Sequence, residues 1–174
     1  MSRAPDPPPG VSSAAVSRSA RVLGLVAAAA IVGFDQASKA WLLDFLTAPP
    51  RVVEISPFVS LVPVWNTGIS FGLFADSAMG GVALAIVALA IVAGLLWWLA
   101  RIETRIAGCA IGLVIGGAVG NVIDRLRFGA VFDFLDLHWG DWHWPAFNLA
   151  DAAITFGVLL ILLDGLFPTA RSAK

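Results

Sequence analysis

Two carboxylates in the C-terminal half of the chain carry the strongest chemical signal. Asp133 stands between Phe132 and Phe134, and Asp151 follows Asn148 after three residues. Two carboxyl groups that share a site do not both ionise easily, so one tends to keep a proton while the other stays charged. The charged member then acts as a general base on water, and the protonated member polarises or protonates a scissile amide. The pair is therefore a candidate for hydrolysis by activated water.

Further polar side chains fall close to the same apolar stretches. If a helix runs through residues 120–125, Asn121, Asp124 and Arg125 share one face, at spacings of three and four residues. Amides and a guanidinium can hold a substrate or stabilise developing charge. The structural alternatives are that Arg125 caps the last carbonyls of this helix, and that Asn148 and Asp151 cap the next helix and complement its dipole.

Asp35 and Lys39 interrupt an otherwise apolar stretch. They lie four residues apart with the carboxylate first, which is the favourable order for an ion pair within a helix. An ionisable residue inside a membrane helix costs a few kcal/mol on insertion scales, so it needs a partner or a function. The pair is either a self-neutralising structural feature or a part of the site. Asn66, two residues before Gly68, indicates a turn.

The elements that position these residues follow from the composition. The 174 residues are 59% hydrophobic and 13% charged, with a mean hydropathy of +0.86, which is more apolar than a soluble domain of this size can bury. A formal net charge of -1 excludes the basic field of a nucleic-acid-binding protein. The single cysteine excludes an internal disulfide and a cysteine-based metal cluster. The lipid bilayer is the solvent that remains.

Four apolar stretches are long enough to cross a bilayer, whose core of about 30 Å takes roughly 20 helical residues. They cover about residues 22–46, 79–100, 106–123 and 149–167. Four spans put both termini on one side. Seven of the 11 Lys and Arg residues lie on that side, in the tails and the short middle loop, and the other four lie opposite. Because positive charge is retained in the cytoplasm, both termini are expected there.

The predicted fold class is an all-α integral membrane protein with four transmembrane helices. Residues 1–20 are expected to form a disordered cytoplasmic tail, residues 21–168 the membrane domain, and residues 169–174 a cytoplasmic C-terminal tail. The outward connection 47–78 carries β-type segments broken by Pro57 and Pro63, long enough to form a small cover.

A stripe of glycines marks the third span. Gly108, Gly112, Gly116 and Gly120 recur every four residues, and small residues let helix backbones approach closely in lipid. The stripe indicates a centrally packed helix, with its partner either within the monomer or in a second chain.

Cys109 and Ser70 are two alternative candidate nucleophiles. Cys109 falls inside the glycine-striped span near its cytoplasmic end, which favours a structural role. Ser70 and Lys39 both lie on the outer side, so a Ser-Lys dyad is an alternative, although nothing in the sequence pairs them.

Metal binding and transport are the remaining alternatives. His138, His143, Asp136 and Asp141 are metal-ligating residue types, but their spacing puts them on no common helical face. The interleaved tryptophans instead favour an interfacial segment that dips into the membrane, so no metal site is expected. Membrane carboxylates with a nearby lysine also form proton or ion paths. A transporter places such groups at mid-bilayer, whereas here they cluster at one surface.

Four separated motifs stand in chain order: Asp35–Lys39 (DQASK), Asn66–Gly72 (NTGISFG), Gly120–Arg125 (GNVIDR) with Val131–Phe134 (VFDF), and Phe147–Asp151 (FNLAD). This set resembles the lipoprotein signal peptidases, also called signal peptidase II, over roughly residues 22–167. The combination is far more specific than any one motif.

The resemblance implies an aspartyl endopeptidase of the bacterial cytoplasmic (inner) membrane. Such enzymes remove the signal peptide from diacylglyceryl-modified prolipoproteins by cleaving before the lipidated cysteine. Asp133 and Asp151 match the catalytic pair. The other matched positions are the site-lining residues Asn66, Asn121, Arg125 and Asn148 and the supporting polar residues Asp35, Lys39 and Asp124.

The resemblance also implies a layout for the outer face. It places a small extracytoplasmic β-cradle around residues 51–74, an outward amphipathic segment over residues 134–144, and the active site near the outer face. It implies no metal or other cofactor, and it implies membrane lipids and globomycin-type inhibitors as further partners.

Overall fold

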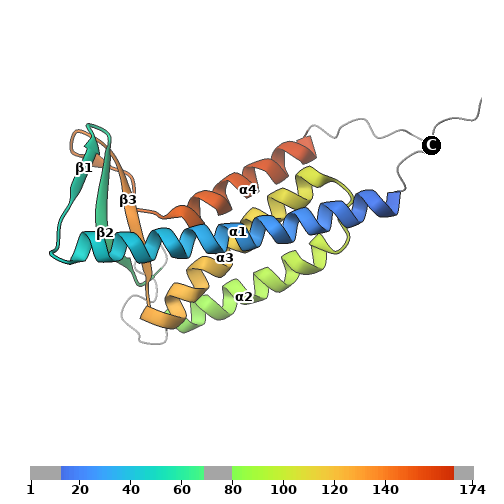
Figure 1. Ribbon diagram of the computed structural model, residues 1–174, viewed down its shortest axis with the longest axis horizontal. Coiled ribbons are helices and arrows are strands. Elements are labelled where there is room, and N and C mark those ends of the chain that lie inside the picture. The colour runs from blue at the N-terminus through green and yellow to red at the C-terminus, as the bar shows by residue number, and fades with distance from the viewer. Residues whose placement is uncertain (1–12, 69–79, 167–174) are drawn as a thin grey trace, which may run out of the picture.

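Four helices and one small sheet make up the part of the chain that the computed structural model describes, residues 13–68 and 80–166. The helices are α1 (Ser13–Thr47), α2 (Gly80–Leu99), α3 (Arg105–Phe128) and α4 (Leu149–Leu166). They lie side by side, and the sheet covers one end of the bundle (Figure 1). All four are long and apolar enough to cross a membrane.

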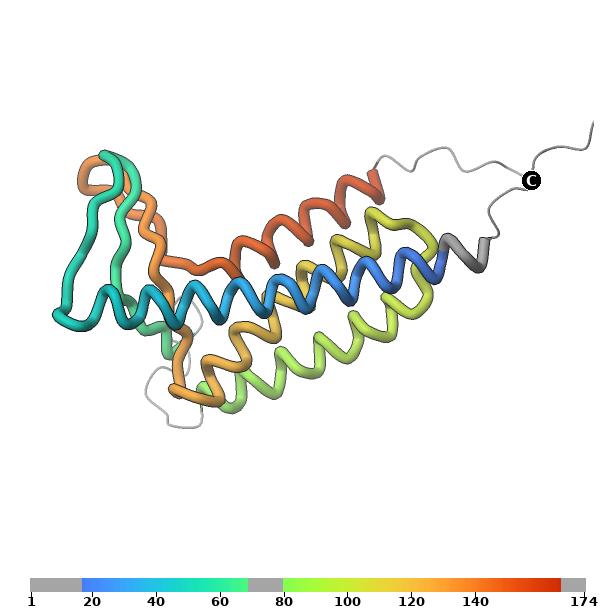
Figure 2. Tube along the Cα trace, viewed as in Figure 1, coloured from blue at the N-terminus to red at the C-terminus, as the bar shows by residue number. Residues whose placement is uncertain are grey.

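Helix α3 is the centre of the bundle. It packs against α1, α2 and α4, and 13 of its 24 residues are buried, against five of 20 in α2 and three of 18 in α4. The start of α1 and the end of α4 both lie at the end of the bundle away from the sheet (Figure 2).

The glycine stripe packs against α1 of the same chain. A methyl group at Gly112 would overlap the backbone carbonyl of Gly24, and one at Gly108 would overlap that of Ala20. Gly116 meets the backbone of Ala28 in the same way, one helical turn further along. The glycines therefore allow backbone-to-backbone contact between α1 and α3, and the alternative of a partner in a second chain is not needed to explain them.

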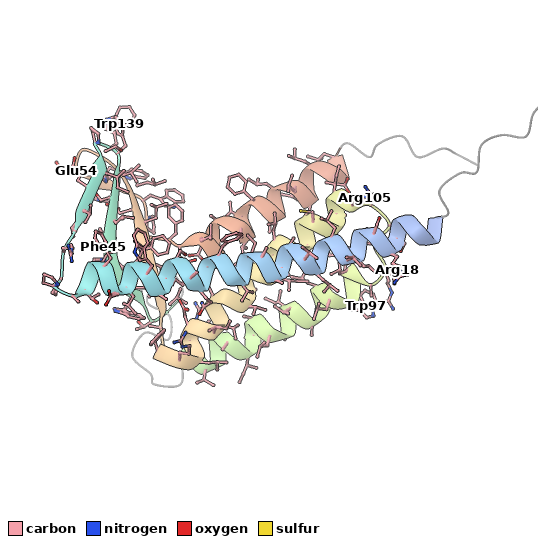
Figure 3. All side chains as sticks on the ribbon, viewed as in Figure 1. Arg18, Phe45, Glu54, Trp97, Arg105 and Trp139 are labelled. Carbon is pink, nitrogen blue, oxygen red and sulfur yellow. The ribbon has the colours of Figure 1, made fainter. Side chains whose placement is uncertain are left out.

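The outer faces of the bundle are apolar. Ile86 of α2 is 62% exposed, and Phe156 and Leu162 of α4 are 64% and 56% exposed. Large apolar side chains that face outward over whole helices are matched to lipid rather than to water. The charged Arg18 and Arg105 lie at the end of the bundle away from the sheet (Figure 3).

The sheet is antiparallel, with the strands in sequence order. Its strands are β1 (Val53–Ser56), β2 (Val59–Asn66), β3 (Val131–Trp139) and β4 (Trp142–His143). Pro63 lies inside β2, where sequence alone favoured a break, because the register shifts between Leu61 and Val64 and a bulge accommodates it.

Strand β3 connects the sheet to the bundle. Phe132 and Phe134 pack against Leu42 and Leu46 near the end of α1, in a buried apolar cluster. This contact fixes the sheet over the end of the helices, and it brings Asp133, which lies between the two phenylalanines, to the same place.

Helices α1 and α3 extend further than the sequence predicted. Residues 13–20 form the first turns of α1 rather than a disordered tail, because Ala20 packs against Gly108 of α3. Residues 1–12 and 167–174 lie outside the described residues. Helix α3 continues past residue 123 to Phe128 and ends at Gly129, whose φ of 74° provides the left-handed cap. Segment 134–144 forms the hairpin of β3 and β4.

Substitution of a stripe glycine tests the contact between α1 and α3. We expect Gly112→Ala to lower the free energy of unfolding by about 1–3 kcal/mol, because the Gly24 carbonyl belongs to a helix backbone and cannot move away. The matched control is Gly94→Ala on α2, where a methyl group meets nothing within 4 Å; it should be neutral or stabilising by up to about 1 kcal/mol. Unfolding in mixed micelles measures both, and equal stabilities would contradict the packing.

Candidate active site

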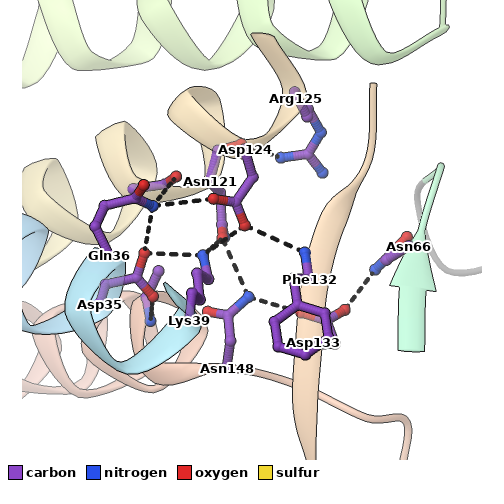
Figure 4. Close-up of polar contacts among 12 residues, drawn as sticks. Asp35, Gln36, Lys39, Asn66, Asn121, Asp124, Arg125, Phe132, Asp133 and Asn148 are labelled. Atoms are coloured by element: carbon purple, nitrogen blue, oxygen red, sulfur yellow. Dashed lines mark hydrogen bonds and ion pairs between the residues drawn. The ribbon is translucent and has the colours of Figure 1, made fainter. Parts of the chain in front are cut away.

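The nine residues predicted from sequence meet where the sheet joins the bundle, and Figure 4 labels all of them except Asp151. Their origins are α1 for Asp35 and Lys39, β2 for Asn66, α3 for Asn121, Asp124 and Arg125, β3 for Asp133, and the start of α4 for Asn148 and Asp151. Five elements thus contribute to one polar cluster at one end of an apolar bundle.

A buried lysine holds the cluster together. Lys39 Nζ lies 2.8 Å from Asp35 Oδ2 and 2.9 Å from Asp124 Oδ2, and it donates to Asn121 Oδ1 at 3.1 Å. Lys39 is 5% exposed and Asp35 is fully buried, so each charge depends on its partners. The ion pair that the spacing of Asp35 and Lys39 predicts is present, and it extends from α1 to α3.

The two carboxylates that bind Lys39 also hold backbone. Asp35 Oδ1 accepts a hydrogen bond from the Ala150 amide at 3.0 Å, at the start of α4. Asp124 Oδ2 accepts one from the Phe132 amide at 3.1 Å, near the start of β3. Each carboxylate therefore ties one of the elements that carry Asp133 and Asp151 to the lysine.

Gln36 is a member of the cluster that the sequence analysis missed. Its Nε2 donates to Asp124 Oδ1 at 2.9 Å and to Asp35 Oδ2 at 3.2 Å. A signal was present, since an amide next to Asp35 inside an apolar span needs a polar partner just as the charge does.

Asn148 and Asp151 cap α4, as their spacing predicts, and they also form hydrogen bonds with the polar cluster. The Asp151 amide donates to Asn148 Oδ1 at 3.0 Å, and the Asn148 amide donates to Asp151 Oδ2 at 3.2 Å, which is the reciprocal pattern of a capping box. The remaining atoms point into the cluster. Asn148 Nδ2 donates to Asp133 Oδ1 at 2.6 Å, and Asp151 Oδ1 accepts from Asn121 Nδ2 at 2.7 Å.

Asp133 occupies a dry, amide-lined position. It is 2% exposed, and its two oxygens accept from Asn148 and from Asn66 Nδ2, the latter at 3.1 Å. Asn66 is itself oriented by a turn, since its Oδ1 accepts from the Gly68 amide at 3.2 Å. The pKa of Asp133 is raised to about 6. Burial is the main cause, and the negative charge of Asp151 also raises the pKa, whereas the hydrogen bonds from the two amides lower it.

Arg125 lies in the last turn of α3 and is partly buried. Its Nη1 donates to the carbonyl of Asn121 at 3.4 Å, one turn back in α3. Its Nε is buried and finds no hydrogen-bond partner among the described residues. Because α3 continues to Phe128, the Asn121 carbonyl lies inside the helix, so this contact does not cap the helix end.

The amino-acid sequence is similar to those of known proteins. The family model described as Signal peptidase (SPase) II matches residues 27–167. The chain belongs to the signal peptidase II family. A lipoprotein signal peptidase from Methylorubrum extorquens (strain PA1) is 46% identical over 153 residues, which are 86% of this chain and 88% of that protein. One from Anaplasma phagocytophilum (strain HZ) is 40% identical over 141 residues, 81% and 90% of the two chains.

Solved structures share the fold of this signal peptidase II chain. A bacterial membrane enzyme determined by the in meso method at 2.3 Å resolution matches with a TM-score of 0.71 and 26% identity, covering 87% of this chain and 92% of that one. Another, at 1.9 Å, matches with a TM-score of 0.70 and 27% identity, covering 84% and 94%. The chain is thus a multi-pass bacterial membrane protein of a peptidase family.

The other candidate nucleophiles lie elsewhere. Cys109 is half-buried in α3, 12 residues before Asn121, which is about 18 Å along a helix axis. Ser70 lies outside the described residues, and Lys39 already binds two carboxylates and an amide. These contacts disfavour Lys39 as the base of a Ser-Lys dyad.

The site predicts a strong dependence of stability on Lys39. We expect Lys39→Met to lower the free energy of unfolding by about 3–5 kcal/mol, because two carboxylates remain buried without their cation. Arg127→Met is the control, since Arg127 is exposed at the same end of the bundle and surface substitutions change stability by roughly 0.5 kcal/mol or less. Unfolding in mixed micelles gives both values; a similar loss in the two variants would rule out a stabilising role for the buried cluster.

The charge of Asp151 predicts the titration of Asp133. In the folded protein the Asp133 carboxyl should titrate with a pKa of about 6. Asp151→Asn should lower that pKa, because removal of a nearby negative charge favours the ionised form of Asp133. Carbon-13 NMR of labelled aspartate follows the titration, and Asp44→Asn, an exposed change on α1, is the control. An unchanged or raised pKa in Asp151→Asn would show that the two carboxyls do not interact.

Proposed function

We propose that Asp133 and Asp151 are the catalytic dyad of an aspartic endopeptidase that removes signal peptides from diacylglyceryl-modified prolipoproteins, cutting before the lipidated cysteine. The observation that carries the proposal is that both carboxyl groups are hydrogen-bonded partners of Asn148 or of its capping box. The backbone amide of Asn148 donates to Asp151 Oδ2, and its Oδ1 accepts from the Asp151 amide. Its side-chain Nδ2 donates to Asp133 Oδ1. Family membership supports the substrate class, since curated relatives carry the name lipoprotein signal peptidase.

The roles of the two carboxyls differ in this proposal. Asp133 holds its proton to a pKa of about 6, well above the usual value of an aspartate, because it is already buried. Asp151, in the carboxylate form, takes a proton from water as the water oxygen attacks the scissile carbonyl carbon. Asp133 gives its proton to the carbonyl oxygen. Proton return to the leaving nitrogen then breaks the C–N bond, which leaves a carboxylate on the signal peptide and an amine on the cysteine.

The amides and the guanidinium serve substrate binding in this proposal. Asn66, Asn121 and Asn148 keep the two carboxyls apart and oriented. Arg125 offers the free donor of its buried Nε to a peptide carbonyl or to developing negative charge. Asp35, Lys39 and Asp124 support the site by fixing the elements that carry the dyad.

An apolar groove that includes Asn148, but neither Asp133 nor Asp151, supports a lipid-linked substrate. It has a volume of about 240 Å³ and is lined mainly by apolar side chains, among them Phe134, Phe147 and Leu149, and it reaches Asn148. An acyl chain or the end of a signal helix fits such a surface, and either would bring the scissile bond to the end of the bundle.

The orientation follows from the distribution of charge. We place the sheet end outside the cytoplasm and both termini inside, because seven of the 11 Lys and Arg residues belong to the other end of the bundle and its tails. The sheet then forms the extracytoplasmic cradle, and the β3–β4 hairpin, with exposed Trp139, Trp142 and Trp144, forms the outward amphipathic segment. We propose a membrane domain over residues 21–168, an N-terminal tail over residues 1–20 and a C-terminal tail over residues 169–174. Within the N-terminal tail, residues 13–20 are helical.

Inhibition and cofactor use follow from the same proposal. A dyad of carboxyls activates water without a metal ion or other cofactor. Cyclic peptides of the globomycin type should compete for the groove and the dyad.

Substitution of either dyad member tests the function. We expect Asp133→Asn and Asp151→Asn each to lower the rate of cleavage by at least about 10²–10⁴-fold, the contribution of a positioned acid or base. The assay follows cleavage of a diacylglyceryl-modified precursor peptide by the purified full chain in lipid-containing micelles. Asp44→Asn, an exposed carboxylate on α1, should leave the rate unchanged. Normal turnover by a folded variant of either dyad residue would overturn the assignment.

A further inference from the structure

Both histidines of the chain lie in one β-hairpin. The chain has two histidines, and the register of β3 with β4 pairs His138 directly with His143. Their rings stack with centroids 5.2 Å apart and an interplanar angle of 25°. Residues paired across antiparallel strands project to the same face of the sheet, so the two imidazoles face the same surroundings.

Asp136 completes a group of three possible ligands. It lies two residues before His138 on β3 and therefore shares its face. Asp136 Oδ2 is 2.9 Å from Nδ1 of His143 and 3.3 Å from Nδ1 of His138, and one ligand atom from each residue lies within 4.8 Å of the others. In a tetrahedral zinc site, with bonds of about 2.0–2.1 Å, neighbouring ligand atoms are about 3.3 Å apart. The two distances from Asp136 Oδ2 to the histidine nitrogens are close to that value.

One atom of the group lacks a hydrogen-bond partner. His138 Nδ1 is buried, and although it lies 3.3 Å from Asp136 Oδ2, it makes no hydrogen bond among the described residues, whereas such atoms are normally hydrogen-bonded. The side chain of Asp136 is 10% exposed, so its charge also benefits from a bound cation. The side chain of His143 is 56% exposed, which leaves a path from solvent.

We propose that Asp136, His138 and His143 bind a divalent transition-metal ion of the zinc type, with a fourth position open to water. Two neutral imidazoles and one carboxylate form a donor set that suits Zn²⁺. Sequence spacing argued against metal binding because these residues share no helical face. The segment is a hairpin instead, and antiparallel pairing brings together ligands that a helix would separate. Asp141, the fourth residue considered from sequence, lies in the turn outside the group.

The ion would act on the structure around the dyad and not within it. Asp133 lies three residues before Asp136 on β3, so the two side chains project to opposite faces of the strand. An ion held by β3 and the two-residue β4 clips the hairpin closed. Five residues after His143 the chain reaches Asn148, and Phe147 is held to Leu135 by backbone hydrogen bonds of 2.8 and 3.0 Å. Metal binding would therefore rigidify the segment that delivers Asn148.

Zinc binding by the full chain tests the proposal directly. The protein is purified in detergent without a histidine tag, loaded with Zn²⁺ alone, passed through gel filtration, and analysed for metal content and by competition with a chromophoric chelator. We expect one Zn²⁺ per chain. His143→Ala and Asp136→Asn should each weaken binding by at least about tenfold, whereas Asp141→Asn, an exposed change in the same hairpin, should bind as the unchanged chain does.

Two further measurements keep the outcome clear. Co²⁺ in place of Zn²⁺ should give the visible absorption of a tetrahedral site, and this absorption should be lost in His143→Ala. Because His143 is exposed, its substitution preserves the fold, which circular dichroism checks. Absence of retained Zn²⁺, or equal affinity in His143→Ala and the unchanged chain, would overturn the proposal. These readouts are independent of peptidase activity, so they do not depend on the proposed dyad.

Discussion

The close approach of α1 to α3 is the constraint on which the rest of the structure depends. Lipid gives apolar helices no hydrophobic reason to associate, so their packing relies on dispersion and on contact between backbones. The α3 glycines permit that contact from Gly108 to Gly116, and the last glycine of the stripe, Gly120, faces the Asp35 carboxylate. A side chain at Gly108, Gly112 or Gly116 would meet the α1 backbone and move α1 away, and a lysine on α1 would no longer reach Asp124.

The short distance between these helices allows a single buried cation to organise the site. Lys39 binds Asp35 and Asp124, and these carboxylates accept from the backbone amides at the starts of α4 and β3. Asn121, which also accepts from Lys39, donates to Asp151. In a low-dielectric interior such linked hydrogen bonds strengthen one another. The positions of Asp133 and Asp151 are therefore set by charges that take no direct part in the proposed reaction.

Much of the fold and of the candidate site could be predicted from local sequence, and the features that could not be predicted have physical causes. Run length and hydropathy predicted four helices, but not that α1 begins at Ser13, because its first turns are stabilised by contact with Gly108. Residue type predicted Asn148 as a cap of α4, but not its second contact with Asp133. His138 and His143 gave no helical pattern, since the period of a strand is two residues and its partner comes from another strand.

The sequence by itself determined that the chain lies in a lipid bilayer, how many helices it has and which residues are capable of chemistry. Hydropathy, charge and residue type, on which these conclusions rest, are properties of short stretches. Only the tertiary structure decided which of those residues meet. Asp133 and Asn148 are 15 residues apart in the chain, and Asp35 and Ala150 are 115 apart. No local pattern encodes such pairs, since they depend on how closely the helix backbones pack and on where the sheet docks against them.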